Sequence, residues 1–236
     1  MTPILKKEFT AFFASPIAYL VVGVFLVING LFLWIFKDDF NILNAGFADL
    51  NNFFYLAPWV FLFLIPAITM KSFADEFNSG TIEILKTRPI TNWQIVLGKF
   101  LASLLLVVVA LLPTLTYVYT VYQLGNPIGN LDFGSSIGSY IGLLLLAGTY
   151  TAVGLFTSTL SKNQIVAFIL SVFITFFLYF GFDAFANLVG NQNISKFGIN
   201  EHFKSISRGV IDTRDIVYFA SLTAFFLFIT KTQLDE

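Results

Sequence analysis

The stretch Phe100–Tyr122, with the sequence FLASLLLVVVALLPTLTYVYTVY, decides the fold class of this chain. It runs for 23 residues without a single Asp, Glu, Lys, Arg or His. A helix of about 20 mainly apolar residues is long enough to cross the hydrocarbon core of a bilayer. The stretch therefore predicts a transmembrane helix, and Pro113 is expected to kink it because proline removes a backbone donor.

Five further stretches are similarly apolar and also lack ionisable residues. They are Pro16–Phe36, Phe53–Met70, Ile137–Leu160, Ile165–Phe182 and Ile216–Thr230. The last is the shortest, and a re-entrant or interfacial helix is the alternative for it. Over the whole chain of 236 residues, 57% are hydrophobic and 11% are charged, whereas a soluble domain carries about 25% charged residues. The sequence predicts an all-α integral membrane protein, a single transmembrane domain over residues 1–236 with six spanning helices.

The same residues exclude several function classes. Ion-coupled carriers usually place ionisable groups at membrane depth, and these spans hold none. The single histidine, His202, is not part of an H-E-x-x-H motif, and there is no cysteine, so neither an enzyme nor a metal site is expected. A net charge of −1 argues against nucleic-acid binding.

A nucleotide site is also absent from the sequence. The nearest fragment to a P-loop, Gly98-Lys99-Phe100, lacks the first glycine and the final hydroxyl of that motif. We therefore expect this chain to bind no ATP and no other cofactor. If the chain takes part in active transport, the energy must come from another polypeptide.

Basic residues indicate the orientation, because they are enriched on the cytoplasmic side of membrane proteins. With the N-terminus inside, the short outer loops hold only Lys37, while the long connection before the last span holds four basic residues. The inner segments then hold Lys6, Lys7, Lys71, Lys86, Arg88, Lys99, Lys162 and Lys231. This distribution favours a multi-pass protein with both termini in the cytoplasm.

Residues 1–15 are expected to form an amphipathic interfacial helix. Leu5, Phe9, Phe12 and Phe13 share one helical face, and Lys6 and Lys7 occupy the other. Such a helix lies in the membrane interface with its apolar face down. The alternative is that these residues only extend the first span.

Residues 71–99, between the second and third spans, predict two short helices. Phe73 and Phe77 share a helical face from which Asp75 and Glu76 point away, and Gly80 ends the helix. Thr81 can begin a second helix that ends at Leu85. Thr91 and Gln94 form a capping box for the third span, with Ile90 and Ile95 as a hydrophobic staple. We expect a rigid element on the cytoplasmic face; a solvated loop between two spans is the alternative.

This connection resembles the signature of ABC-2-type transporter permeases. The similar runs are SFADE (Ser72–Glu76), GTIEIL (Gly80–Leu85), RPI (Arg88–Ile90) and WQIVLGK (Trp93–Lys99). The resemblance implies six spans, an amphipathic N-terminal helix, helices on the outer side before the last span, and location in the bacterial cytoplasmic (inner) membrane. It also implies that ATP is bound and hydrolysed by a separate ATPase subunit, that a second permease copy or a related membrane subunit completes the pathway, and that transport is mostly export.

The resemblance further implies a set of residues that contact the ATPase in the cytoplasmic coupling-helix segment. They are Phe73, Asp75, Glu76, Phe77, Gly80, Thr81 and Glu83. The carboxylates would pair with basic residues of the partner, and the two phenylalanines would enter an apolar cleft. Residues 202–218 are most similar to the permeases associated with bacterial gliding motility.

The connection 183–215 is too long for a simple turn and is expected to be an extracellular helical or re-entrant segment. Residues 201–209 can form a short helix that Gly209 stops, and Thr213 can cap the last span. Phe203, Arg208 and Asp212 are candidate gate or packing residues. Gly134, Gly138 and Gly142 repeat every four residues and favour close helix packing, either within the subunit or at a dimer contact.

The leading hypothesis is a permease subunit driven by a separate ATPase, with the lipid bilayer as its solvent. A stand-alone passive pore and a scaffold of a motility or secretion apparatus are the alternatives.

Overall fold

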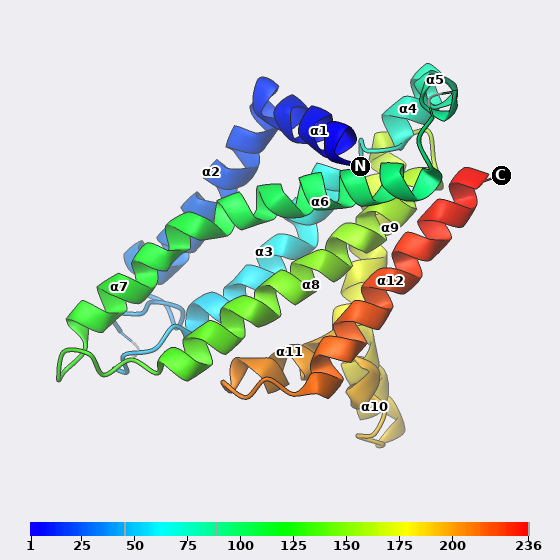
Figure 1. Ribbon diagram of the computed structural model, residues 1–236. Coiled ribbons are helices and arrows are strands. Elements are labelled where there is room, and N and C mark those ends of the chain that lie inside the picture. The colour runs from blue at the N-terminus through cyan, green and yellow to red at the C-terminus, as the bar shows by residue number, and fades with distance from the viewer. Residues whose placement is uncertain (45, 88, 236) are drawn as a thin grey trace.

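The structure is a computed structural model that describes residues 1–44, 46–87 and 89–235. These residues form helices and connections, and no β-strand occurs among them. In chain order the α-helices are α1 (Thr2–Ala14), α2 (Pro16–Gly30), α3 (Asn51–Thr69), α4 (Ala74–Ser79), α5 (Thr81–Lys86), α6 (Asn92–Leu111), α7 (Leu115–Leu124), α8 (Phe133–Thr159), α9 (Gln164–Phe176), α10 (Phe182–Val189), α11 (Ile199–Ser207) and α12 (Thr213–Asp235) (Figure 1). Two π-helical segments, η1 (Leu31–Ile35) and η3 (Phe177–Gly181), and two 3₁₀ segments, η2 (Leu112–Thr114) and η4 (Ser195–Phe197), complete them.

Among the described residues, six helical units are long and apolar enough to cross a membrane. They are Pro16–Ile35, Asn51–Ser79, Asn92–Leu124, Phe133–Thr159, Gln164–Val189 and Thr213–Asp235. Each contains one of the predicted stretches or most of it, so the prediction of an all-α membrane protein with six spanning helices is confirmed. The last unit has 23 residues and is long enough to span, although its apolar stretch is short. At Pro113 the helix passes through the 3₁₀ segment η2 between α6 and α7, as proline leads one to expect.

Helix α8 lies at the centre of the bundle and packs against α3, α6, α9, α11 and α12. Small side chains allow these backbones to approach closely. At Gly154 a Cβ atom would lie 2.0 Å from the hydroxyl oxygen of Thr69 on α3, which leaves no room for any side chain. At Gly138 a Cβ atom would lie 2.6 Å from the carbonyl oxygen of Ile206 on α11. The glycines of α8 thus determine where its neighbours lie.

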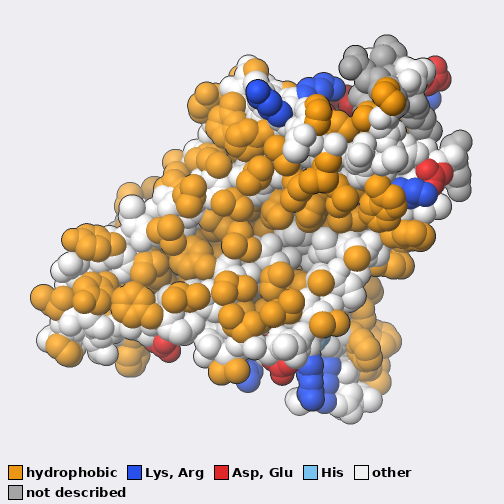
Figure 2. Space-filling view, in the orientation of Figure 1, with side chains coloured by type: hydrophobic (Ala, Val, Ile, Leu, Met, Phe, Trp, Pro, Cys, Tyr) orange, Lys and Arg blue, Asp and Glu red, His pale blue; other side chains and the backbone are white. Residues whose placement is uncertain are grey.

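Apolar side chains cover the flank of the molecule, and charged side chains gather at its two ends (Figure 2). The lipid-facing helices expose large apolar residues such as Leu20 on α2 and Phe173 on α9. Both termini, α4 and α5 lie at one end, and α10 and α11 lie at the other (Figure 1). We call these the terminal end and the opposite end.

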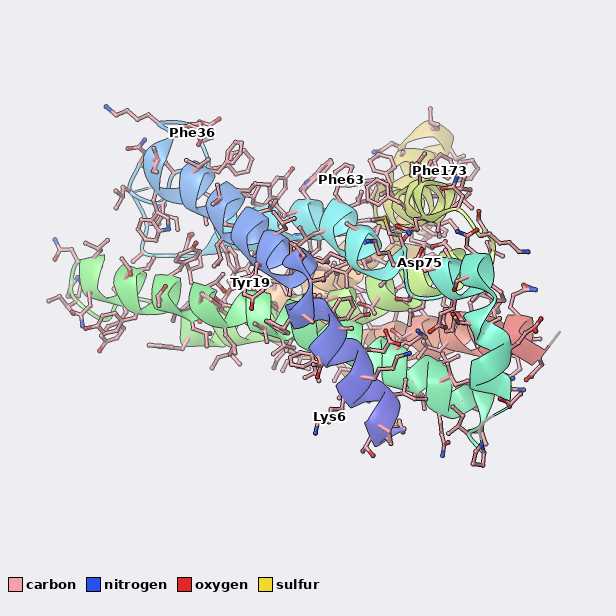
Figure 3. All side chains as sticks on the ribbon, turned by 90° about the horizontal axis from the view of Figure 1, so that it is seen from above. Lys6, Tyr19, Phe36, Phe63, Asp75 and Phe173 are labelled. Atoms are coloured by element: carbon pink, nitrogen blue, oxygen red, sulfur yellow. The ribbon has the colours of Figure 1, made fainter. Side chains whose placement is uncertain are left out.

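Helix α1 is a separate helix and does not extend the first span. The chain becomes extended at Ser15, whose hydroxyl caps α2 by accepting from the Ile17 amide. Helix α1 then lies across α6, with Lys6 directed outward (Figure 3). Ile4 is its buried contact with α6: a Cβ atom at Gly98 would lie 2.9 Å from the Ile4 side chain.

The long connection before α12 is helical, as predicted. Gly209 follows its last helix, also as predicted, but the residue that caps α12 is not the predicted one. Gly190 and Gly209 adopt positive φ angles of 71° and 85°, so each ends a helix where L-residues are disfavoured. The prediction that Thr213 caps the last span is wrong. Asp212 is the capping residue, because its Oδ1 accepts from the Arg214 amide at 2.8 Å, and Thr213 is already the first residue of α12.

Candidate functional site

The exposed tip at the terminal end is the turn between α4 and α5. Gly80 ends α4 with a φ of 69°, which glycine adopts without strain. The hydroxyls of Ser79 and Thr81 lie 2.9 Å apart across the turn. Gly80, Thr81 and Glu83 are exposed, so this tip is a surface that another protein can reach.

Directly behind the tip, one lysine joins three helices. The ammonium of Lys99 on α6 donates to Glu76 Oε1 on α4 at 2.8 Å and to Glu8 Oε1 on α1 at 2.9 Å. Lys99 is 2% exposed, and the side chains of Glu76 and Glu8 are 13% and 18% exposed. The Lys99 ammonium also lies 5.2 Å from the centre of the Phe73 ring, within reach of a cation–π contact. We call Glu8, Glu76 and Lys99 the ion triad.

The ion triad fixes geometry more than it adds stability. Removing charges from water is costly, and a buried pair recovers that cost only with close and well-directed contacts. Here both contacts are at hydrogen-bonding distance, which restricts how α1 and α4 can move relative to α6. The three helices are therefore expected to move as one unit.

Two further hydrogen bonds connect helices at the terminal end. Asp75 on α4 accepts a hydrogen bond from the Gln164 side chain at the start of α9. Asn92 at the start of α6 donates to Asp235 at the end of α12 at 2.7 Å. These contacts link α4 to the start of α9, and the start of α6 to the end of α12.

The structure separates the predicted ATPase-contact residues into two groups. Gly80, Thr81 and Glu83 are exposed at the tip, whereas Phe73 is fully buried in a core with Ile95 and Val96. Glu76 does not point away from the core as the sequence suggested, because its carboxylate turns inward to Lys99. Asp75 and Phe77 are half-buried, and Asp75 already has the partner described above. Arg88, which belongs to the family-like run RPI, lies outside the described residues.

The predicted capping box is confirmed. The Thr91 hydroxyl accepts from the Gln94 amide, and the Gln94 side chain accepts from the Thr91 amide. This reciprocal cap fixes where α6 begins, which places Lys99 two turns into the helix and under α4. The sequence interpretation included Lys99 among the inner basic residues and in the run WQIVLGK, and it did not single out Glu8. Glu8, a charged residue within the predicted amphipathic helix of residues 1–15, was the one signal in the sequence for the ion triad.

A pocket of about 330 Å³ lies beside the ion triad, between α1 and the end of α3. Its lining includes Glu8, Asp75, Glu76 and Lys99, which are already engaged in the contacts described above. Within the described part of the chain no group of His, Cys, Asp or Glu is arranged to hold a metal ion. The contacts between helices α1, α4 and α6 in this arrangement suit the transmission of movement.

At the opposite end, His202 connects α11 to α12 and to the segment before α11. Its Nδ1 lies 2.6 Å from Asp215 Oδ1 on α12, and its Nε2 lies 2.9 Å from the Lys196 carbonyl. The ring stacks on Tyr218 at 3.8 Å between centroids. The sequence interpretation took His202 for an ordinary polar residue, but in the structure it links α11 to a buried carboxylate of α12.

The three candidate gate residues occupy different surroundings. Phe203 is buried and packs against Gly142 of α8, Arg208 is exposed at the end of α11, and Asp212 caps α12. Gly138 and Gly142 face α11 of the same chain, and Gly134 lies against Gly209. These glycine contacts lie within the subunit, and a dimer contact through them stays a prediction.

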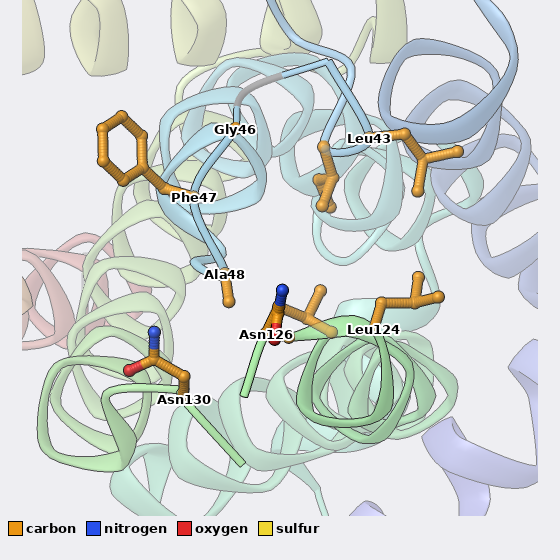
Figure 4. Close-up of a pocket in the computed structure, with 10 residues that line it drawn as sticks. Leu43, Gly46, Phe47, Ala48, Leu124, Asn126 and Asn130 are labelled. Carbon is orange, nitrogen blue, oxygen red and sulfur yellow. The ribbon is translucent and has the colours of Figure 1, made fainter. Parts of the chain in front are cut away.

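A second pocket at the opposite end, of about 320 Å³, lies between the α2–α3 connection and the end of α7 (Figure 4). Leu43, Phe47 and Leu124 line it together with the amides of Asn126 and Asn130. None of the described residues that line it is ionisable, so it offers no acid–base or ionic chemistry.

The comparisons with known proteins agree with this architecture. No curated protein matches the chain at a significant level. The family model described as "ABC-2 family transporter protein" matches residues 2–232, which is nearly the whole sequence and includes the ion triad, the exposed tip and the outer helices. The chain belongs to the ABC-2 family of transporter proteins and is a multi-pass membrane permease.

Proposed function

We propose that this permease is the membrane subunit of an ATP-driven exporter and that a separate ATPase drives it through contacts at the terminal end. The ATPase docks on the exposed tip formed by Gly80, Thr81 and Glu83. A second copy of the permease, or a related membrane subunit, completes the pathway. The chain lies in the bacterial inner membrane with both termini in the cytoplasm, in accordance with its basic residues.

The ion triad is the observation that carries this proposal. A motor can transmit movement only through an element that moves as a body. Behind the exposed tip, Glu76 is held by Lys99, and Lys99 is part of a spanning helix. A displacement of α4 would therefore be passed to α6 through the ammonium, and to α1 through Glu8.

The sequence supports a separate source of energy. It contains no P-loop, and its predicted spans contain no ionisable residue that could bind a coupling ion. Four of the other spanning helices, α3, α6, α9 and α12, pack on the buried α8 and leave little room for a pathway within one chain. Two copies would supply about twelve spans around a central path.

Copurification tests the docking surface. The ATPase should copurify with the wild-type permease in mild detergent and be lost with Glu83→Lys, which reverses an exposed charge at the tip. The matched control is Glu201→Lys, the same exposed charge reversal at the opposite end, which should retain the ATPase. Equal copurification with both variants would contradict docking at the tip.

We also propose that the exporter serves the gliding-motility machinery, which is supported by the similarity of residues 202–218 to that subgroup. A deletion strain of the source bacterium should then lose gliding but not growth, and a plasmid copy should restore it. Normal gliding in the deletion strain would refute this assignment and leave the exporter proposal intact.

A further inference from the structure

A third pocket, of about 330 Å³, opens at the opposite end between the start of α3, η3 and α11. Its apolar side is formed by Phe54, Tyr179 and Phe203, whose side chains are almost completely buried. Its polar side carries Lys204 and Arg208. The pocket is thus apolar on one side and cationic on the other.

Lys204 on α11 and Arg208, the residue that caps the C-terminus of α11, are four positions apart and are therefore neighbours on one face. Like charges at this spacing destabilise a helix, and a bound anion would remove that repulsion. None of the described residues that line the pocket is Asp or Glu. Glu201 Oε1 lies 3.7 Å from Lys204 Nζ. Because Glu201 is half exposed and does not line the pocket, it offsets the positive charge of Lys204 only weakly.

The remaining polar groups at the pocket leave the two cations available. Asn200 donates to Asp183 Oδ2 at 2.7 Å, and the other oxygen of that carboxylate, Asp183 Oδ1, is buried without a hydrogen-bond partner among the described residues. The Ser207 hydroxyl is enclosed and makes no hydrogen bond to any part of the chain that the structure describes. It is therefore a donor next to Arg208 that a ligand oxygen can use.

We propose that this pocket binds an anionic amphiphile, one whose phosphate headgroup carries a net negative charge. Arg208 and Lys204 hold the phosphate oxygens, since a guanidinium matches phosphate with two parallel hydrogen bonds and lysine adds a point charge. The buried rings receive the first part of the apolar chain. The inference rests on the proposed function only in placing this end at the outer membrane interface, where such molecules lie.

The test compares lipid retention by the purified full-length permease. Native mass spectrometry counts phosphatidylglycerol and phosphatidylcholine that stay bound after exchange from mixed micelles. Wild type should retain phosphatidylglycerol selectively. The double variant Lys204→Gln with Arg208→Gln should bind it at least about tenfold more weakly, because two charge-assisted hydrogen bonds are lost. Arg208→Lys should keep part of the affinity.

The matched control is Lys196→Gln with Arg214→Gln, which removes the same charge from the same end outside the pocket. It should bind like wild type. Equal loss in both double variants would overturn the proposal, because it would show a general effect of surface charge.

Glycerol phosphate is the competing probe, since it carries the headgroup without acyl chains. The amphiphile should bind much more tightly than glycerol phosphate. If glycerol phosphate displaced phosphatidylglycerol at equal concentration, the rings would contribute nothing and the proposal would fail. These measurements involve no ATPase, so their failure would leave the docking proposal untouched, and failure of the docking test would leave the lipid result untouched.

Discussion

Lys99 on α6 and Glu76 on α4 lie 2.8 Å apart, from Nζ to Oε1, and Lys99 also holds Glu8 on α1 at 2.9 Å. The lysine is 2% exposed, so this ammonium is a buried junction between three helices. It joins α4 to a spanning helix without any residue of the exposed tip. The tip and its attachment can therefore be tested separately.

Removing the central cation should destabilise the protein strongly. Lys99→Met leaves two buried carboxylates close together, and breaking a buried ion pair in this way costs about 3–5 kcal/mol. Unfolding by SDS in mixed micelles, followed by circular dichroism, measures the loss of unfolding free energy.

The compensating triple variant is the control. Lys99→Met combined with Glu8→Gln and Glu76→Gln removes all three charges and should recover most of the lost stability, since an uncharged buried group of similar size is often tolerated. A triple variant as unstable as Lys99→Met alone would show that packing, and not charge, explains the loss.

The same triple variant should separate docking from transmission. Its exposed tip is unchanged, so the ATPase should copurify at the wild-type level. Its link between α4 and α6 is gone, so the permease should no longer alter the rate of ATP hydrolysis. Phosphate release by the reconstituted complex measures this, and a wild-type response would contradict transmission through the ion triad.

Cysteine labelling can test the orientation of the chain directly, because the sequence contains no cysteine. Asn78→Cys lies at the exposed tip and Asn191→Cys lies at the opposite end. A membrane-impermeant maleimide should label Asn191→Cys in intact spheroplasts, and Asn78→Cys only after permeabilisation. The reverse pattern would place the tip outside the cell, where no ATPase could reach it.

Two glycines of α8 should respond in opposite ways to the same substitution. At Gly154 a Cβ atom would lie 2.0 Å from the Thr69 hydroxyl, which donates to the Ile65 carbonyl, so Gly154→Ala should cost about 1–3 kcal/mol. At Gly148 the nearest atom would be 3.9 Å away, so Gly148→Ala should be neutral or gain about 0.5–1 kcal/mol from helix propensity. Thermal unfolding in detergent compares them, and equal effects would contradict the packing described here.

The link between His202 and Asp215 should hold α11 against α12. His202→Ala leaves the buried Asp215 carboxylate without its hydrogen-bond partner and should destabilise the helices of the opposite end by about 1–3 kcal/mol. Hydrogen exchange over residues 199–207 should become faster, while exchange in α4 and α6 stays unchanged. Tyr218→Phe is the milder comparison: it removes one hydrogen bond to the Phe197 carbonyl and should cost about 1 kcal/mol. Unchanged exchange in His202→Ala would show that apolar packing alone holds this segment.

Local patterns predicted most of the fold. The six spans follow from uninterrupted apolar length, and Gly80, Gly209 and the box of Thr91 with Gln94 end or begin helices where the sequence indicated. Each of these features depends on residues within one or two turns, so no knowledge of neighbours is needed. The capping residue of α12 was placed at Thr213 and not at Asp212, because both can cap and only the path of the chain after Gly209 selects one.

The candidate site could be predicted only in part. The exposed tip was found through the run around Gly80, but the sequence assigned Phe73 and Glu76 to the surface as well. The structure buries the Phe73 ring and turns Glu76 inward, because α1 and α6 close over that side of α4. Helical periodicity states which residues share a face, and it does not state which face meets a neighbour.

The sequence by itself determined that this chain is a six-span helical membrane protein with short helices between its second and third spans. Apolar length and local caps suffice for that, because the bilayer acts on each segment separately. Only the tertiary structure decided that Lys99 joins Glu76, 23 residues away, and Glu8, 91 residues away. Such pairs depend on how the helices cross, which is set by contacts such as Ile4 on Gly98 and Thr69 on Gly154 that are distant in the chain.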